Sequence, residues 1–500
     1  MATDSSMFFP NQKALPPTFD YRPKPSAVAG RSFRVSVPAS NASSFSAGQT
    51  AIFNIPCGRQ RCFLDPQQSY LRYTIKSAQP NFVTTATATS ALIAPSLPTN
   101  AVVTNGNGVY GSGLFLDHNA YSVWNTSTLY SGSNQIEYIN NCNILYGYLL
   151  DTNFSYANAL SNSATYGLYV PTCDPSEIRR GQLLAFGTVG TATATSTATT
   201  ATYEQNTYCV PILSGLLGIG SSGQMVPIHA IQDVLRLELL TEQQTQAFCQ
   251  LGSTNSAPAY SIVNAQLELC YVEVGAEGMA LINSMQPPSN PTFIVGTSYA
   301  HYVNTIKSGT TGVFSCLVPS KLASLKSIHV LPRRSTEINA AGSYSLSSRI
   351  NPYMDYAVFK ISGTQFPQVP IWLQNASTTG NYSEALCELQ RCFGSLIATD
   401  KATLLNYNNF NVGIVANAGT GVNAISTGTE SFKNAFSIGL DLELYSSKDT
   451  IINGLNCLSE SMYFECNISA DPGADITLDF YSIFDNLFIL DTTGYLSSRR

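Results

Sequence analysis

The heptapeptide AGQTAIF at residues 47–53 returns as SGTTGVF at residues 308–314 of a 500-residue chain. Upstream of these two segments, the tripeptide Phe33-Arg-Val likewise matches Phe293-Ile-Val. Matches that recur in the same order at a long spacing indicate one structural unit used twice. We therefore interpret the chain as two copies of one module.

Further segments keep the same order in both halves. Each half continues with an alternating apolar run, a segment of helical spacing, a short leucine-rich motif and a final alternating run. The pairs are SYLRYTI (69–75) and SLKSIHV (324–330), residues 135–150 and 383–397, LRLEL (235–239) and LDLEL (440–444), and AQLELCYVEV (265–274) and ITLDFYSI (476–483). The spacing within the pairs shrinks along the chain, which is explained if the first half carries the longer loops.

Most of the regular segments have the pattern of β-strands. Runs such as TAIFNI (50–55), VLRLELL (234–240) and YAVFKI (356–361) alternate apolar and polar residues between Gly, Pro and Ser clusters. A module of roughly 200 residues with about eight strands is typical of a jelly roll, whereas an immunoglobulin-type sandwich needs only about 100 residues. The sequence predicts an all-β chain of two tandem eight-stranded jelly rolls (a double jelly roll), with long apical loops and a short helix in each half.

The duplication and the composition divide the chain into five parts. We expect an extended N-terminal arm (1–31), a first jelly roll with long loops (32–275), a linker (276–291), a second jelly roll (292–490) and a C-terminal tail (491–500). Pro287, Pro288 and Pro291 mark the linker, because proline interrupts regular structure.

Two segments have the spacing of helices. In QIEYINNCNILYGYLL (135–150) and SEALCELQRCFGSLI (383–397), apolar residues recur at intervals of three and four. These positions are Ile136, Ile139, Tyr146, Leu149 and Leu150 in the first segment, and Leu386, Leu389, Phe393, Leu396 and Ile397 in the second. Asn134 and Asn381 are positioned to cap the two helices.

Two long stretches, 84–108 and 187–206, are rich in Thr and Ala. Alanine adds little side chain to bury, and low-complexity sequence of this kind is typical of exposed loops. Loops this long in a compact β protein are often interfacial or functional. We expect both stretches to be apical loops outside the core.

The composition favours a subunit of a larger assembly. Only 11% of the residues are charged, and the net charge is −6. So little charge fits a protein that buries much of its surface against other subunits. The N-terminal arm has few basic residues, so we expect no direct nucleic-acid binding. No segment has the pattern of a signal peptide or of a membrane span.

Gly218, Gly220 and Gly223 in PILSGLLGIGSSGQMVPIH satisfy the G-x-G-x-x-G spacing of dinucleotide-binding folds. That fingerprint needs a helix starting at its third glycine, but Pro227 follows and no helical period begins there. A second match, TNGNGVYG (104–111), lies within a loop. We interpret the glycines of the first match as tight turns in an apolar connection near a subunit interface, and we expect no cofactor.

The residues that carry chemistry form no recognisable site. The four histidines, His118, His229, His301 and His329, occur in neither H-E-x-x-H nor H-x-H, so we interpret them as structural or surface residues. The twelve cysteines include no C-x-x-C pair and are expected to be free, mostly buried thiols. There is no G-x-S-x-G motif and no P-loop. We therefore predict no catalytic, cofactor-binding or metal-binding residue, and no enzyme activity.

The segments from both halves carry a resemblance to a known family. The chain resembles the double jelly-roll major capsid proteins of tailless icosahedral double-stranded DNA viruses, and looks most like those of polinton-like viruses and virophages. The resemblance covers about Ser32 to Arg500. It rests on SNQIEYINNCNILYGYLLD (133–151), YCVPILSGLLGIGSSGQMVPIHAIQDVLRLELL (208–240), NAQLELCYVEV (264–274), VPSKLASLKSIHVLPRR (318–334), IGLDLELYSSKDTIINGLNCLSE (438–460) and ITLDFYSIFDNLFILD (476–491).

The resemblance implies a structural role and a set of partners. Three chains would form a pseudo-hexagonal capsomer, a homotrimer with two jelly rolls per chain whose apical loops face outward. The capsomer would contact neighbouring capsomers, penton proteins and minor capsid or cement proteins, in part through the terminal arms. The protein would reside in the virion after assembly in the host cytoplasm or nucleus. The family has no catalytic residues, and contact with an inner membrane is left open.

Three other functions stay open at this point. They are a secreted or surface adhesin built from lectin-like, carbohydrate-binding β-sandwiches, a carbohydrate-active enzyme with two jelly rolls, and a viral coat protein with one jelly roll and a projecting domain. The lack of a signal peptide argues against the adhesin. The one-jelly-roll coat protein requires that residues 292–500 lack the fold of residues 32–275.

Overall fold

The computed structural model describes most of the chain. The described residues are 29–77, 103–105, 108–110, 114–167, 205–250, 259–339, 345–373, 382–396, 403–405, 410, 435–444 and 452–500. The predictions for residues 1–28 and for most of the two Thr/Ala-rich stretches concern residues outside this set.

The first half folds into two antiparallel sheets that face each other. Sheet I has the order β1 (Gly30–Pro38), β13 (Tyr260–Val274), β4 (Cys62–Ser77) and β10 (Gln205–Pro211), with β2 (Ser44–Ser46) added on β13. Sheet II has the order β3 (Thr50–Ile55), β11 (Leu235–Thr241), β8 (Trp124–Ser131) and β9 (Asn134–Ile139). Two short pairs, β5 (Val103–Asn105) with β6 (Gly108–Tyr110) and β7 (Leu114–Leu116) with β12 (Phe248–Gln250), lie outside these sheets.

The second half repeats this arrangement. Sheet III has the order β14 (Thr292–Ile306), β21 (Ile476–Leu490), β16 (Leu325–Arg334) and β19 (Ile438–Asp441), with β22 (Leu496–Arg499) added on β21. Sheet IV has the order β15 (Gly312–Val318), β20 (Met462–Ile468), β17 (Met354–Ile361) and β18 (Thr364–Trp372). In both halves the first, eighth, third and sixth of the eight main strands form one sheet, and the second, seventh, fourth and fifth form the other. The predicted double jelly roll is confirmed, and the alternative with a single jelly roll is excluded.

The strand order tests the proposed internal matches. The matches at 33–35 and 293–295 fall in the first strands β1 and β14, and the final runs fall in the eighth strands β13 and β21. The match of LRLEL with LDLEL is wrong, because β11 is a seventh strand, whereas residues 440 and 441 end the sixth strand, β19. Alternating leucines recur in any half-buried strand, so this motif does not identify a position in the fold.

The helices differ from the prediction of one in each half. The first half contains the 3-10 helix η3 (Ala120–Val123), α1 (Cys142–Asn153), α2 (Tyr156–Ser161), α3 (Ser163–Tyr166) and α4 (Gln244–Ala247). The predicted linker contains α5 (Ala276–Met285), and the second half contains α6 (Ser383–Cys392). Helix α6 agrees with its prediction but ends earlier, at the turn of Gly394, whose φ is +61°. The proposed cap Asn381 and the apolar residue Ile397 lie outside the described residues.

The predicted helix 135–150 is half wrong. Its first residues form β9, in which Ile136 and Ile139 are buried while Tyr138 is exposed. The helix begins only at Cys142, after Asn141 takes a left-handed conformation with φ of +47°. Asn134 therefore starts a strand and caps no helix. Five residues are too few to separate a strand period from a helix period, which explains the error.

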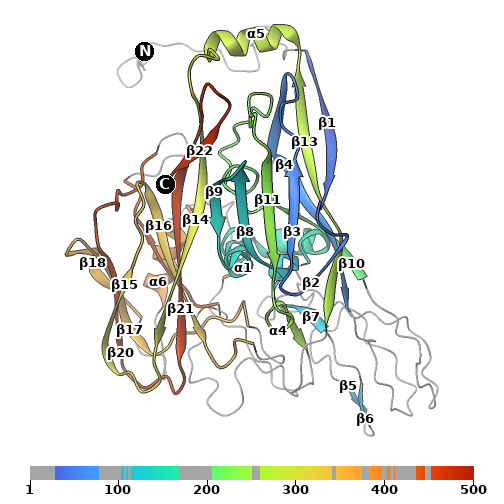
Figure 1. Cartoon of the computed structure of the whole chain (residues 1–500). Helices are drawn as coiled ribbons and strands as arrows, with labels where there is room; N and C mark the ends of the chain where they lie inside the picture. The colour runs from blue at the N-terminus through green and yellow to red at the C-terminus, as the bar shows by residue number, and fades with distance from the viewer. Residues whose placement is uncertain are drawn as a thin grey trace, which may run out of the picture.

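The four sheets lie side by side in the order IV, III, II and I across the molecule (Figure 1). Sheet III therefore has sheet IV on one face and the first jelly roll on the other. This position explains why β21 is buried along nearly its whole length, whereas β13 keeps exposed or half-buried positions. The buried apolar side chains form one continuous cluster through both halves.

Candidate functional site

The two jelly rolls meet over a buried polar interface that we call the joint. The first jelly roll contributes β9, α1 and the connection 212–234 between β10 and β11. The second contributes β14, β21 and β16 of sheet III and the segment 345–353 before β17. The contacts across the joint that are described below join residues far apart in the sequence, from Ser221 with Gly296 to Asn141 with Tyr481, so only the tertiary fold creates them.

A buried glutamate lies at the centre of one part of the joint. The Glu137 carboxylate of β9 accepts hydrogen bonds from Ser214 Oγ (2.5 Å) and from the Gly215 backbone N–H (2.8 Å). It also accepts one from Ser298 Oγ of β14 (2.7 Å), across the joint. Burial raises the pKa of the Glu137 carboxyl above its ordinary value, although these three donors oppose the rise.

Two glycines of the G-x-G-x-x-G match, Gly218 and Gly220, lie closely against other backbone segments, and Gly220 packs against β14. The Thr297 backbone N–H donates to the Gly220 carbonyl at 2.6 Å, and Ser221 forms a β-bridge with Gly296. A Cβ atom at Gly220 would overlap the Thr297 carbonyl oxygen. These glycines therefore allow one backbone to approach another closely. The partner of Gly220 is the second jelly roll of the same chain, whereas the partner of Gly218 is Ile212 in the same connection. A contact with another subunit stays a prediction.

No helix follows Gly223 in the described stretch 205–243, so the element that a dinucleotide fingerprint requires is missing there. Of the three glycines in the match, Gly223 has a positive φ, +86°, as the predicted tight turns require. In the second match, Gly108 begins β6, and Gly106 and Gly111 lie outside the described residues.

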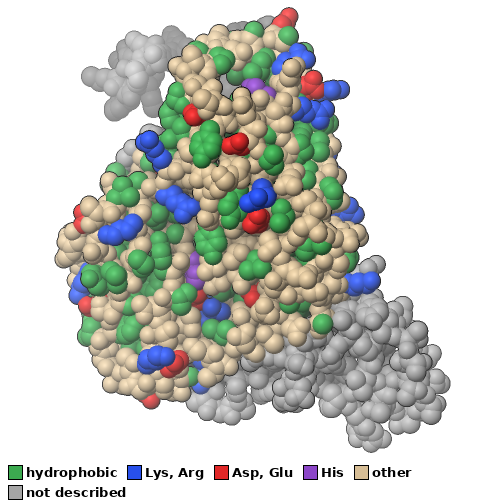
Figure 2. All heavy atoms as spheres, in the orientation of Figure 1, with side chains coloured by type: hydrophobic (Ala, Val, Ile, Leu, Met, Phe, Trp, Pro, Cys, Tyr) green, Lys and Arg blue, Asp and Glu red, His purple; other side chains and the backbone are tan. Residues whose placement is uncertain are grey.

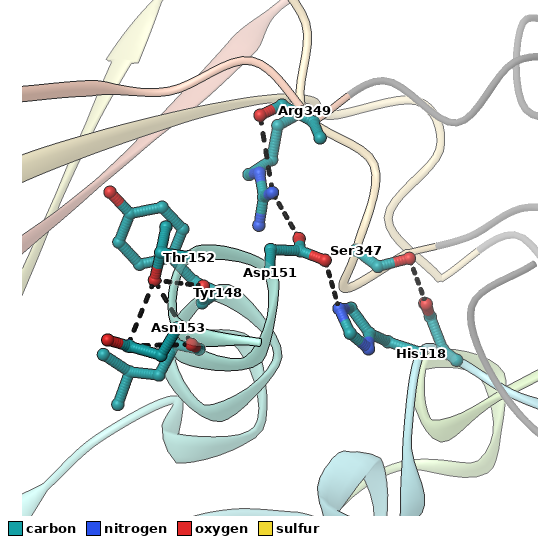
Figure 3. A network of polar contacts seen from close by, with 10 residues as sticks. His118, Tyr148, Asp151, Thr152, Asn153, Ser347 and Arg349 are labelled. Atoms are coloured by element: carbon teal, nitrogen blue, oxygen red, sulfur yellow. Dashed lines mark hydrogen bonds and ion pairs between the residues drawn. The ribbon is translucent and has the colours of Figure 1, made fainter. Parts of the chain in front are cut away.

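An aspartate at the end of α1 connects the halves a second time (Figure 3). Asp151 Oδ1 lies 3.0 Å from His118 Nε2, and Asp151 Oδ2 accepts a hydrogen bond from Arg349 Nη2 of the second jelly roll at 2.5 Å. The neighbouring Asp117 accepts from the Leu346 N–H and from Ser347 Oγ, both at 2.6 Å. Both carboxylates are buried, so each one needs these partners to offset the loss of water.

A third contact lies on the face of sheet III that is turned away from sheet IV and towards the first jelly roll. Asp479 Oδ2 accepts from Arg333 Nε at 2.6 Å, and Asp479 Oδ1 lies 2.9 Å from His301 Nε2. Burial acts to raise the Asp479 pKa, but Arg333 and His301 outweigh it, and the pKa lies below its ordinary value. The Tyr481 hydroxyl next to this group donates to the Asn141 carbonyl of the first jelly roll at 2.9 Å.

The four predicted structural histidines differ in their surroundings. His118 and His301 pair with aspartates at the joint, and His329 Nδ1 lies 2.9 Å from the hydroxyl of Tyr148 in α1. Burial lowers the pKa of His329 to about 3, so this imidazole is neutral. His229 is half-buried against Phe63, and burial lowers its pKa as well.

The described residues give no sign of a metal or redox centre. Within them, no group of three or more His, Cys, Asp and Glu side chains is arranged to hold a metal ion. The ten cysteines with described side chains are all free, and five of them are buried. None of the helices in the described part of the chain is long and apolar enough to cross a membrane. At the joint, the polar groups that the structure describes bind one another across the two jelly rolls.

Glu137, Asp151, Arg349 and Asp479 were not predicted from the sequence as functional residues. One signal was available for Asp151 and Asp479, because each is a lone charge at the end of or inside an apolar run, NILYGYLLD and ITLDFYSIF. A charge in such a run is either exposed at an edge or paired in the core. For Glu137 and Arg349 the local sequence gave no comparable signal.

Comparison with known proteins addresses the fold. No family model matches the chain, and a comparison with curated proteins finds no match. Among solved structures, the capsid of the virus PBCV-1 is similar over 97% of this chain and 100% of its own, with 8% identity and a TM-score of 0.55. The capsid of the Sputnik virophage (97% and 92% coverage, 11% identity) and the mavirus major capsid protein (97% and 94% coverage, 9% identity) both have TM-scores of 0.54. The chain therefore shares the double jelly-roll fold of these capsid proteins.

Proposed function

We propose that this chain is a major capsid protein, the structural subunit of an icosahedral virus shell. The observation that carries the proposal is the pairing of two jelly rolls of identical strand order through the joint. Together with the likeness to solved capsid proteins over nearly the whole chain, this arrangement favours a shell subunit over an adhesin or an enzyme.

Three chains would place six jelly rolls in one ring, which gives a pseudo-hexagonal capsomer. The low charge supports such an assembly, since a subunit surface that is covered by neighbours needs few charges. Assembly also covers the edges of sheets, which would otherwise pair non-specifically. The capsomer would contact neighbouring capsomers, penton proteins and minor capsid proteins in the virion.

As a capsid subunit, the chain would be divided into five parts. We assign residues 1–31 to an arm, 32–275 and 292–490 to the two jelly rolls, 276–291 to the connection and 491–500 to a tail. Helix α5 and the strand β22 add regular structure to the last two segments. The arm would extend from the jelly rolls to adjacent capsomers, whereas β22 of the tail pairs with β21 of its own chain.

The oligomeric state tests this function. Purified full-length protein, measured by size-exclusion chromatography with light scattering, should elute as a trimer of 53.8 kDa chains. Electron microscopy of the same sample should show particles with three-fold symmetry and a six-sided outline. A protein that stays monomeric at concentrations of tens of micromolar would contradict the proposal.

A further inference from the structure

The N-terminal arm joins the described structure directly beside helix α5. Strand β1 pairs antiparallel with β13, with Gly30 opposite Val274, and the Gly275 N–H donates to the Ala29 carbonyl at 2.7 Å. Helix α5 begins at the next residue, Ala276. Because β1 and β13 run in opposite directions, the chain before Ala29 leaves sheet I at the end where α5 begins.

Helix α5 crosses between the two jelly rolls at that end of the molecule and is covered on one side only (Figure 1). Leu281 (54% exposed) and Met285 (79%) lie one turn apart on its exposed side, and Phe293 (52%) lies at the start of β14. The Gln286 side chain donates to the Pro291 carbonyl at 3.0 Å, which holds the start of β14 near the end of the helix. We call Leu281, Met285 and Phe293 the α5 patch.

The α5 patch has the character of a binding surface. Residues 278–293 contain no charged side chain, so nothing in this stretch favours exposure of its large apolar residues to water. Figure 2 shows apolar side chains at the end of the molecule where Figure 1 places α5. Neighbouring apolar side chains that are exposed together are typical of a site that another segment covers.

The last part of the arm has the pattern of an extended segment with one apolar edge. In FDYRPKPSA (19–27), Phe, Tyr, Pro, Pro and Ala occupy the odd positions, and Asp, Arg, Lys and Ser occupy the even positions. Arg22 and Lys24 each precede a proline, which favours extended backbone at both residues. Side chains of an extended chain alternate between two sides, so the sequence places the aromatic residues and the prolines together on one edge.

The length of this segment fits the path along the helix. The 10 residues of α5 span about 15 Å, at about 1.5 Å per residue. Pro25 precedes Ala29 by four residues and Tyr21 precedes it by eight, which correspond to about 13 Å and about 26 Å of extended chain. The segment between Tyr21 and Pro25 can therefore follow α5 to its end and reach the whole α5 patch.

We propose that residues 19–27 bind along α5 of the same chain, with their apolar edge on the α5 patch and their charged edge towards solvent. The tether favours this occupant, because a segment that is linked to its site has an effective concentration of about 1 mM. Residues 1–18 remain free to extend to adjacent capsomers. The inference goes beyond the proposed function, since a contact within one chain requires no assembly.

Oxidation of Met285 measures whether the α5 patch is covered. Hydrogen peroxide converts an exposed methionine to its sulfoxide, and peptide mass spectrometry of the full-length protein gives the initial rate at this residue. At an effective concentration of about 1 mM, a contact with a Kd of about 0.3 mM covers the patch about three quarters of the time and slows oxidation about fourfold. Removal of residues 1–28 should therefore raise the rate at Met285 about fourfold.

Two double variants distinguish the two edges of the segment. The variant Phe19→Ser, Tyr21→Ser removes both aromatic residues from the apolar edge and should raise the oxidation rate towards that of the deletion. The matched variant Arg22→Ser, Lys24→Ser changes as many residues on the charged edge and should keep the slow rate of the wild type. If the wild type and the apolar-edge variant are oxidised equally fast, the segment does not cover the patch and the inference is wrong.

Photo-crosslinking identifies which α5 the arm binds. A photo-crosslinking residue in place of Tyr21 should crosslink to peptides of residues 276–293. In a mixture of isotope-labelled and unlabelled chains, both crosslinked peptides should come from one chain. Crosslinks that join a labelled chain to an unlabelled one would assign the arm to another copy and overturn the inference, as would crosslinks to other segments. A monomeric wild-type protein rejects the proposed capsomer but leaves the docking of the arm within one chain untouched.

Discussion

Helices α1 and α6 hold the same place in the two jelly rolls, between the fifth and sixth strands, yet they differ in almost every other respect. All residues of α1 except Asn153 are buried, and the helix CNILYGYLLDTN has apolar residues on all sides. In α6, only Ala385 and Leu389 are fully buried, and Glu388 pairs with Arg391 on the outside.

The difference shows how a duplicated module was adapted to two positions. Helix α1 lies between the jelly rolls, so water reaches almost none of it, and its one charge must be paired in the interior. Helix α6 covers β19 on one side only, and its other side keeps the charged residues of a surface helix. Equivalent places in the chain therefore have different burial, because only one of them lies at the joint.

The largest expected effect comes from breaking the ion pair of each helix. Arg349→Ala leaves the Asp151 carboxylate buried without its cation, which should lower the free energy of unfolding by about 3–5 kcal/mol. Arg391→Ala removes the exposed partner of Glu388 and should cost no more than about 0.5 kcal/mol. Urea unfolding of both variants measures the two losses.

A neutral pair checks the physical reason for this contrast. In the double variant Asp151→Asn, Arg349→Met, no charge is left buried, so part of the lost stability should return. If Arg349→Ala and Arg391→Ala lower the free energy of unfolding by equally small amounts, then the Asp151 carboxylate is not kept from water by the joint. The two helices would then not differ in the way described above.

The next effect concerns the connection 212–234, which packs against β14 at the joint. Gly220→Ala forces a methyl group against the Thr297 carbonyl, and overpacking of this kind costs about 1–3 kcal/mol. The matched control Ser222→Ala changes an exposed residue of the same turn and should be neutral within about 0.5 kcal/mol. Thermal unfolding of both variants gives the comparison, and a neutral Gly220→Ala would show that the joint is not closely packed there.

The smallest effect at neutral pH is that of His329 at its contact with α1, because this group makes the stability depend on pH only below about pH 6.5. Burial lowers its pKa to about 3, whereas an unfolded histidine titrates near 6.5. The unfolded chain therefore binds a proton that the folded chain does not. The stability from this group is complete above about pH 6.5 and falls by up to about 1.4 kcal/mol per pH unit as the pH decreases towards 3.

The variant His329→Gln should remove this slope. Unfolding free energies of the variant and the wild type, measured between pH 4 and 8, give a difference in which all other titrating groups cancel. Parallel curves would mean that His329 is protonated in the folded protein, in conflict with its buried position beside Tyr148.

Several features followed from the sequence because they depend on local pattern. The strands β3, β11 and β17 were predicted within one or two residues. In β3 and β11 buried residues alternate with more exposed ones, and β17 has the apolar composition of a buried strand. The strand β9 was mistaken for the start of a helix, because its buried residues Ile136 and Ile139 are three positions apart, which is a helical spacing. In the strand this spacing arises at a register shift in the pairing of β9 with β8. The buried partners Glu137 and Ser298 could not be paired from the sequence, as 161 residues separate them.

The sequence by itself determined that the chain is a duplicated, mostly β protein with two jelly rolls. The reason is that strand periodicity and the order of segments depend only on the local sequence. Only the tertiary structure decided how the two copies differ. It brought Glu137 to Ser298 and Asp151 to Arg349, packed Gly220 against β14, and left β18 and β1 exposed. The physical reason is that a charge becomes buried, or two backbones approach closely, only where two surfaces meet in space. The residues next to each other in the sequence do not determine which surfaces meet.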